Sequence, residues 1–338
     1  MIKMRKTKLL LIVALIMTLL LSACGSEDST NAEASGDGTY NLKMTHVTQN
    51  THIWQGFSEI LAEELDERSD GRMKLEIYPG GQLGPEADIV QQLENGSIDF
   101  ALLTVPYLSS RIPELDAWNM PFLFESLEAA LEAQDSESAQ EMLGLLSEQG
   151  LNGMGYMHTG LHHLVLKSDP IETTKDVKGL KLRFTGGPSV LEYWEGLGAS
   201  PIAMGLSEVY SALQTGVIDG TSIDSNALLS EKYYEIAKNY VLTGHMAFGG
   251  IFTASQLNYE NMPDEDQEIV NEAVNAAIEW GKVEHLKRER ENLVELEEFL
   301  PVMELEDKAA FIKEAEAIYE KYSAENELIK RFIEENKK

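Results

Sequence analysis

Cysteine is almost absent from this sequence, and the common motifs of catalysis are missing altogether. The 338 residues include one cysteine, Cys24, which has no second cysteine with which to form an intrachain disulfide. There is no Gly-x-Ser-x-Gly turn, no Gly-Lys-Ser/Thr phosphate loop and no Cys-x-x-Cys pair. We therefore expect no enzyme activity and no cofactor. The absence of these motifs does not exclude an enzyme, so a secreted hydrolase or lyase is the alternative. It would need a catalytic nucleophile or a set of metal ligands, and we find neither in the sequence.

Basic residues are scarce relative to acidic ones. The chain has 27 Lys and Arg against 57 Asp and Glu, which gives a formal net charge of -30 at pH 7. Binding to nucleic acid requires clustered basic side chains that neutralise phosphates, so nucleic acid is excluded as a partner. The acidic excess indicates a well-solvated surface and carries no direct information about a ligand.

Histidine is also rare, and its spacing does not suggest a metal site. His162 and His163 are adjacent, and neighbouring residues of a strand point to opposite faces. They could not both bind one metal ion. His46 and His52 are separated by a polar loop without a nearby cysteine or aspartate, so we expect no metal there either.

The sequence has one long apolar run, and it lies at the N-terminus. Four basic residues precede or border the run Leu9–Leu21, which is shorter than the ~20 residues of a membrane span. The following Leu21-Ser22-Ala23-Cys24-Gly25 resembles a bacterial lipobox. That resemblance implies a lipoprotein signal peptide over 1–23 and a fatty-acid anchor, such as palmitate, on Cys24. We expect 24–38 to be a flexible tether and the protein to be exported, with a Gram-positive surface and a periplasm both left open.

Strand and helix patterns alternate through the rest of the chain. Strands predicted at 40–45, 73–78 and 98–103 alternate with helices at 53–68 and 84–93, which indicates a largely parallel α/β sheet. The extended segment 151–166 crosses into a second α/β domain near Gly160, and 247–255 crosses back. The predicted parts are lobe I over 39–160, completed by about 250–290, lobe II over 161–249, completed by about 291–310, and a C-terminal helix over 311–338.

The second domain contains a βαβ unit at Lys181–Gly220. Its first strand ends near Arg183 and runs into a Gly-Gly-Pro turn that includes Gly186. Open α/β sheets bind ligands beyond the carboxyl ends of their strands, and a guanidinium group pairs well with a carboxylate or sulfonate. We therefore predict that Arg183 is the principal ligand contact. We also predict helix over 226–239.

Three segments of this unit resemble one protein family closely: Lys178-Gly179-Leu180-Lys181-Leu182-Arg183, Gly198-Ala199-Ser200-Pro201, and 207–220, SEVYSALQTGVIDG. The chain resembles the solute-binding proteins of tripartite ATP-independent periplasmic (TRAP) transporters, of the DctP type. The resemblance covers about residues 40–335. It implies a two-lobed clamshell of the class II periplasmic-binding-protein type, with a long helix at Asp264–Phe299 spanning both lobes. It also implies capture of a small organic acid and its delivery to a membrane permease driven by an ion gradient.

Several positions depart from the family pattern, and they affect the expected ligand. The resemblance implies a second arginine where this sequence has His162, and Glu-Asn where it has Ser222-Ile223. Asp224 or Asn226 is the expected substitute for the missing amide. The pocket therefore looks less charged than that of a dicarboxylate binder, which favours a monocarboxylate, a sulfonate or a partly apolar ligand. A sensor lipoprotein that uses the same clamshell is a second hypothesis. The other predicted ligand contacts are Thr104 and Tyr107 beyond the third strand, Leu206 on an apolar wall, Gly186, His46 and Trp194.

Overall fold

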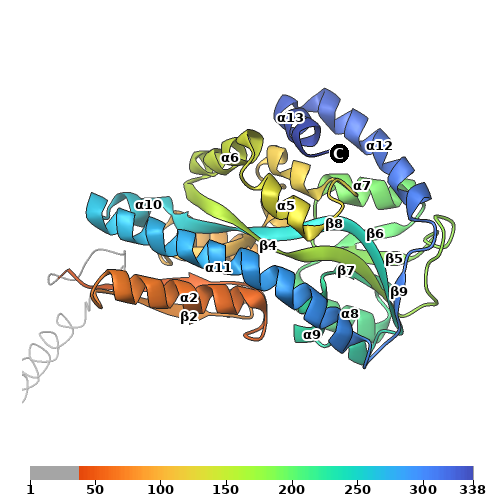
Figure 1. Cartoon of the computed structure of the whole chain (residues 1–338), viewed down its shortest axis with the longest axis horizontal. Coiled ribbons are helices and arrows are strands. Elements are labelled where there is room, and N and C mark those ends of the chain that lie inside the picture. The colour runs from red at the N-terminus through yellow and green to blue at the C-terminus, as the bar shows by residue number, and fades with distance from the viewer. Residues whose placement is uncertain (1–37, 338) are drawn as a thin grey trace, which may run out of the picture. The chain divides into compact units, whose positions relative to one another are not determined.

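A nine-stranded mixed sheet runs through residues 38–337, the part of the chain that the computed structural model describes (Figure 1). The predicted signal peptide, Cys24 and the tether up to residue 37 lie outside the described residues. The strands are β1 (Tyr40–Thr45), β2 (Met73–Tyr78), β3 (Phe100–Thr104), β4 (Leu151–Leu166), β5 (Lys181–Phe184), β6 (Ser200–Ala203), β7 (Gly220–Ile223), β8 (Asn239–Ser255) and β9 (Val302–Glu304).

Two long antiparallel strands, β4 and β8, join two parallel halves of this sheet. The strand order is β2-β1-β3-β8-β4-β7-β5-β6, with β9 also paired to β8. β3 pairs with the end of β8 at 250–254, whereas β7 pairs with the end of β4 at 163–166. The predicted two-lobed α/β class is confirmed. The two crossing segments predicted from the sequence, 151–166 and 247–255, are parts of these shared strands.

Helices cover the sheet and connect its strands. A helix follows each of β1, β2, β5 and β6 and leads to the next strand, which runs parallel in the same half of the sheet, as in βαβ units. The helices are α2 (Ile53–Arg68), α3 (Glu86–Glu94), α4 (Val105–Leu108), α5 (Leu127–Ala133), α6 (Glu137–Gly144), α7 (Pro188–Gly196), α8 (Leu206–Thr215), α9 (Ser225–Ser230), α10 (Gln256–Glu260), α11 (Asp264–Leu296), α12 (Lys308–Glu325) and α13 (Glu327–Asn336), with 3-10 turns at Pro113–Asn119, Leu145–Gln149 and Tyr233–Glu235.

The long helix α11 lies along both halves of the sheet. It packs against α2 and β4 in the first half and against α9 in the second, and Figure 1 shows it crossing the molecule in one piece. A Cβ atom on Gly56 of α2 would lie 2.6 Å from the Trp280 ring, so the glycine allows this close approach. The predicted long helix is therefore present, and it ends at Leu296 rather than Phe299.

Two helical predictions differ from the structure. The segment predicted as one C-terminal helix over 311–338 forms two helices, because Asn326 leaves helical geometry and its side chain caps α13 by accepting from the backbone N–H groups of Leu328 and Ile329. The segment predicted as helix over 226–239 contains short α9 and a 3-10 turn, and then enters β8 at Asn239. At Asn326 polar capping competes with helix continuation. After α9 the chain leaves helical geometry at Lys232, which has a φ of 58°.

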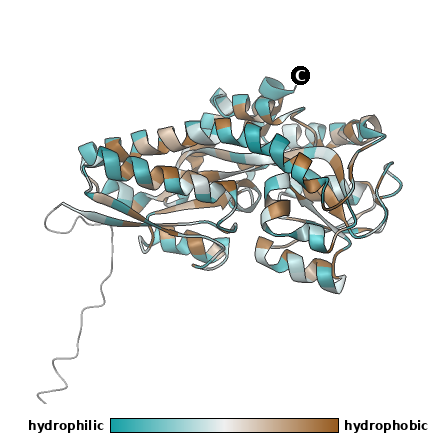
Figure 2. Cartoon of the chain, turned by 60° about the horizontal axis from the view of Figure 1, so that its bottom comes forward, coloured by the Kyte–Doolittle hydropathy of each residue, from teal (hydrophilic) through white to brown (hydrophobic). Residues whose placement is uncertain are grey.

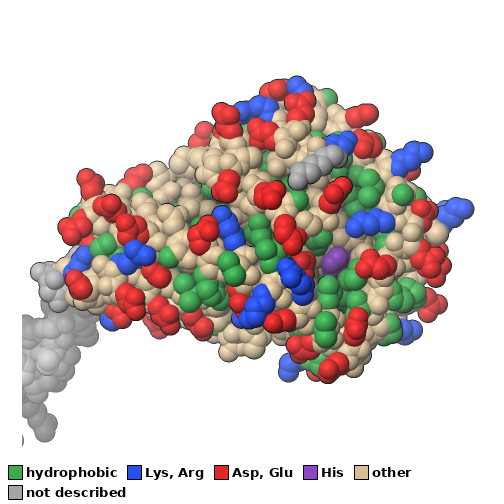
Figure 3. Space-filling model, in the orientation of Figure 1, with side chains coloured by type: hydrophobic (Ala, Val, Ile, Leu, Met, Phe, Trp, Pro, Cys, Tyr) green, Lys and Arg blue, Asp and Glu red, His purple; other side chains and the backbone are tan. Residues whose placement is uncertain are grey.

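Apolar side chains fill the space between the sheet and its helices. Trp54, Trp118 and Trp194 are all fully buried, and the helices in Figure 2 carry hydrophilic and hydrophobic residues in alternation, as amphipathic covering helices do. On the face drawn in Figure 3, acidic side chains are spread widely with basic ones between them. Among residues 38–337, no helix has the length and apolarity needed to cross a membrane.

Candidate ligand-binding site

A cavity of about 520 Å³ lies where the two halves of the sheet meet. Its wall is contributed by loops and helix starts that follow the carboxyl ends of strands in both halves, which is where open α/β folds bind ligands. Residues that line it include Thr48, Glu86 and Thr104 from the first half, and Arg183, Leu206 and Asp224 from the second.

Several helices begin at the wall of this cavity. Glu86 is the first residue of α3, and Leu206 is the first residue of α8. His52 and Asp224 stand at the N-caps of α2 and α9. The unpaired N–H groups and the dipoles of helix N-termini favour negative charge, so this arrangement suits an anionic group.

Arg183 is the basic side chain in the wall. It extends from β5 and is fully buried, and its Nε and Nη2 atoms donate to the Met204 carbonyl at 2.9 and 2.7 Å. Its Nη1 atom has no hydrogen-bond partner among the described residues. A buried, charged donor without a partner is costly unless a ligand satisfies it.

The charge of Arg183 is retained in the cavity. Burial lowers its pKa to about 10, while the nearby charges of Tyr233, Glu86 and Glu231 act to raise it. A pKa near 10 leaves the guanidinium group protonated at neutral pH. Within residues 38–337, no carboxylate forms a direct ion pair with it. The Met204 carbonyl therefore holds one side of the guanidinium group, and Nη1 on the other side is available for an anion.

Glu86 is a wall residue that the sequence did not single out. Its two carboxylate oxygens accept from the Thr104 backbone N–H at 2.6 Å and from the Thr104 hydroxyl at 3.0 Å. Burial raises its pKa to about 7, although the Thr104 hydrogen bonds and the Arg183 charge lower it. The only signal for it in the sequence was its place after Gly84-Pro85 at a predicted helix start, among 57 acidic residues.

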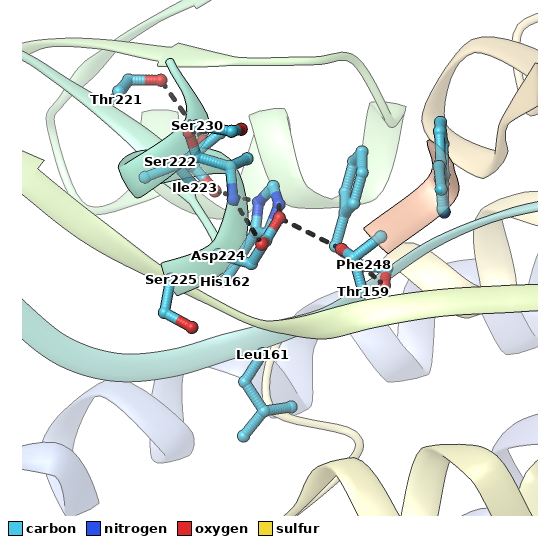
Figure 4. Close-up of polar contacts among 12 residues, drawn as sticks. Thr159, Leu161, His162, Thr221, Ser222, Ile223, Asp224, Ser225, Ser230 and Phe248 are labelled. Carbon is cyan, nitrogen blue, oxygen red and sulfur yellow. Dashed lines mark hydrogen bonds and ion pairs between the residues drawn. The ribbon is translucent and has the colours of Figure 1, made fainter. Parts of the chain in front are cut away.

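Asp224 in the wall and His162 behind it form a buried polar cluster (Figure 4). Asp224 accepts from the Ala227 backbone N–H at 2.9 Å and from the Thr159 hydroxyl at 3.1 Å, and its Oδ2 lies 3.7 Å from His162 Nε2. Burial would raise the pKa of Asp224, but His162 and His52 outweigh it and lower the pKa to about 2. Asp224 is thus an ionised cap of α9 that lines the cavity.

His162 itself does not line the cavity. Its ring stacks on Phe248, with 4.1 Å between ring centroids, and Phe248 forms the wall instead. His162 Nδ1 shares a hydrogen bond of 2.8 Å with the Ser222 hydroxyl, which in turn bonds His245 at 2.9 Å. Burial lowers the pKa of His162, and the positive charge of Arg183 lowers it further, so the ring is neutral at pH 7. The residue in the place of the family's second arginine therefore supplies no cation to the cavity.

Only some of the other predicted contact residues line the cavity. Thr104 and Leu206 line the cavity together with Arg183 and Asp224. Tyr107, Gly186, His46 and Trp194 do not.

Each of these four has another environment. Tyr107 is half-buried on α4, and a Cβ on Gly186 would lie 3.0 Å from the Pro106 carbonyl. His46 is buried, and its ring bonds the Thr48 hydroxyl and Gln55. Trp194 packs in the core against Phe184 of β5 and His245 of β8.

Direct hydrogen bonds join the two halves beside the cavity. The Ile53 backbone N–H at the start of α2 donates to Asn226 Oδ1 on α9 at 3.0 Å, and Gln49 donates to Glu231 at 3.4 Å. The first bond satisfies one of the free N–H groups of a helix start. Across residues 38–337, no group of three His, Cys, Asp or Glu side chains is arranged to hold a metal ion.

The comparisons with known proteins all point to one family of solute-binding proteins. The family model described as "Bacterial extracellular solute-binding protein, family 7" (DctP) matches residues 44–326. A solute-binding protein of Sulfitobacter sp. (strain NAS-14.1) is 30% identical over 272 residues, which cover 78% of this chain and 81% of the relative.

Solved structures of similar proteins share the fold. A TRAP periplasmic solute-binding protein of Bordetella bronchispeptica, with density assigned to pantoate, has a TM-score of 0.83 and 26% identity over 88% of this chain and 99% of that one. Another, from Sulfitobacter sp. NAS-14.1 with bound β-D-galacturonate, has a TM-score of 0.82 and 26% identity over 88% and 99% of the two chains.

Proposed function

Since this chain belongs to family 7 of the bacterial extracellular solute-binding proteins, we propose that its cavity captures a small organic acid through Arg183. The protein is an extracytoplasmic solute-binding protein for a TRAP transporter, and it delivers its ligand to the membrane permease of that system. The similar proteins with pantoate and galacturonate both have carboxylates as ligands, which supports the same class here.

One observation carries this proposal: Arg183 is a fully buried cation whose Nη1 atom lacks a partner and which lines the cavity. A carboxylate or sulfonate would supply the missing acceptor to a buried guanidinium group, where charge-assisted hydrogen bonds are stronger than in water. The helix starts around the cavity favour the same negative group. Leu206 and Phe248 offer apolar surface to the ligand's carbon skeleton.

Binding without catalysis is the function that the site supports. The wall residues of the cavity include no Ser, Cys or His that is paired with a base in the geometry of a nucleophile. A sensor that uses the same ligand-bound state to engage a partner protein is the second candidate, as the site geometry would be the same. Dependence of uptake on the permease separates the two.

Export and anchoring complete the proposal. The lipobox at Cys24 supports a mature protein that begins with a lipidated cysteine and is held on the outer face of the cell membrane. Residues 24–38 would form the tether. Lobe I would comprise 39–160 with a return near 250–290, and lobe II 161–249 with a return near 291–310.

Substitution of Arg183 by Met is expected to weaken binding of an organic acid about 100-fold or more, since it removes a buried charge partner of the ligand worth about 3 kcal/mol. Ligands are first found by thermal shift with a panel of carboxylates and sulfonates, because a ligand that binds the folded state must raise the melting temperature. Calorimetry then gives the affinities of the parent and the variant.

Arg331→Met is the matched control. Arg331 pairs with Glu141 on the surface far from the cavity wall, so its loss should leave affinity unchanged. If no organic acid shifted the melting temperature, or if Arg183→Met bound a ligand as tightly as the parent, the proposed function would be wrong.

A further inference from the structure

The wall of the cavity contains more acid than base. Arg183 is its one basic residue among residues 38–337, whereas Glu86, Glu208 and Asp224 are carboxylic acids. His52 also lines the cavity, but burial lowers its pKa to about 4, so it is neutral at pH 7. A ligand with two anionic groups would therefore place the second one among carboxylates without a cation to pair it.

The three acids differ in their hydrogen-bond partners and in their exposure to solvent. Asp224 is 1% exposed, caps its own helix, accepts from Thr159 and has His162 Nε2 at 3.7 Å, so it is already paired within the second half. Glu208 lies in the first turn of α8 and is exposed to solvent, which screens its charge. Glu86 is the remaining acid, and it does not cap its own helix.

Both oxygens of Glu86 are held by one residue of a different element. The Thr104 backbone N–H and hydroxyl fix the carboxylate at the end of β3, and each oxygen keeps a lone pair for a second donor. Arg183 reaches the same cavity from β5, in the other half of the sheet. The first half thus presents a carboxyl group, and the second half a guanidinium group, to a single ligand.

On the premise of the proposed function, we propose that the ligand of this cavity is a zwitterion, with a carboxylate or sulfonate on Arg183 Nη1 and a cationic nitrogen on Glu86. Such a ligand pairs the free guanidinium donor and the Glu86 carboxylate together, and it adds no net charge to a buried site. Trp54 and Phe248 lie in the same wall, and aromatic faces attract cationic nitrogen, methylated nitrogen included.

The protonation of Glu86 gives this proposal a signature of its own. In the free protein its pKa is raised to about 7 by burial, and the charged group that acts on it is Arg183 on β5. Glu86 in turn raises the pKa of Tyr107 on α4. A bound cation holds Glu86 ionised, so a zwitterion releases protons on binding and loses affinity as the pH falls from 8 to 6. A ligand that carries only an anion favours protonated Glu86 and shows the opposite trend.

Matched pairs of small probes test the class directly by calorimetry. Glycine betaine and 3,3-dimethylbutanoate have the same shape, as do proline and cyclopentanecarboxylate, and 4-aminobutanoate and pentanoate. The first member of each pair is zwitterionic and the second is a plain anion. Succinate and galacturonate are added as a dianion and a sugar acid, and titrations in two buffers of different ionisation enthalpy count the protons exchanged.

At least one zwitterion is expected to bind 10-fold or more tightly than its uncharged-tail partner, with proton release at pH 6.5. Glu86→Gln keeps the shape of the side chain and should abolish that preference. Glu94→Gln, the same change at the far end of α3, should preserve it. If the plain anions, succinate or galacturonate bind more tightly than the zwitterions, the zwitterion proposal is wrong and the proposed function still holds. The same conclusion follows if the preference for zwitterions survives Glu86→Gln. Absence of binding by every probe and by the full organic-acid panel overturns both.

Discussion

Acidification from pH 7 to pH 5 is expected to lower the free energy of unfolding by several kcal/mol and to unfold the protein at a mildly acidic pH. All seven histidines of the chain lie in the described residues, and each is buried. Burial lowers the pKa of every one of them. The values fall to about 4 for His46 and His52 and about 3 for His158, His163 and His285, with His162 and His245 also lowered.

The direction of the effect follows from which state binds protons. In the unfolded chain a histidine has a pKa of about 6.5, so it gains a proton as the pH falls below that value, while the buried neutral ring does not. The contribution of each ring to stability is complete above pH 6.5 and is lost between pH 6.5 and its folded-state pKa. One such ring accounts for about 2 kcal/mol between pH 7 and pH 5.

Buried carboxyl groups oppose this loss in part. Burial raises the pKa of Glu86 to about 7, and those of Asp99, Asp116, Glu231 and Glu289 are raised as well. Burial of these ionised carboxylates destabilises the fold at neutral pH. This cost disappears as the groups take up protons on acidification. Only Glu86 has a shift comparable with those of the histidines, so the histidines determine the sign.

His285 supplies a precise test of this prediction. It is buried on α11, and neither of its ring nitrogens has a hydrogen-bond partner within residues 38–337. His285→Leu removes one titrating ring without breaking a hydrogen bond. Urea unfolding of parent and variant at pH 5 to 8 should show a pH dependence that is smaller by about one proton in the variant. A stability that is flat down to pH 5 in the parent would contradict the histidine account.

The structure places Arg183 in the cavity wall and Trp194 in the core, for physical reasons that differ. A short alternating strand that ends in a Gly-Gly-Pro turn predicts a side chain near the carboxyl edge of the sheet, and Arg183 lines the cavity there. Trp194 is close in the chain, but the direction of a helix after a strand depends on packing. α7 turns its tryptophan into the core.

The surroundings of the other wall residues depend on contacts between distant segments. Phe248, 86 residues later on β8, stacks on the His162 ring and lines the cavity, whereas His162 does not. Glu86 is distinguished from the other acids of the chain only by its two hydrogen bonds to Thr104 on β3. Neither contact has a local sequence signal, so the fold class was predictable from pattern while the charge balance of the cavity was not.

Gly250→Ala is expected to destabilise the fold by about 3 kcal/mol, because this position has no room for a methyl group. Gly250 lies in β8 between Thr104 of β3 and Met157 of β4. A Cβ there would lie 2.7 Å from Trp54 Cζ2 and 2.8 Å from the Leu103 carbonyl oxygen. Real Cβ atoms do not approach so closely, and the carbonyl belongs to a strand that cannot move alone.

Gly144→Ala is the control for this prediction, since a Cβ at that last residue of α6 meets no atom within 4 Å. That variant should be unchanged or more stable by up to about 1 kcal/mol, because alanine is favoured over glycine in a helix. Urea unfolding followed by circular dichroism measures both. Trp54 lines the cavity, so the methyl group of Gly250→Ala should also displace the Trp54 ring toward the ligand and weaken its binding. Parent-like stability together with parent-like affinity would show that β8 and Trp54 are not in the contact described, since a Cβ at this position must displace one or the other.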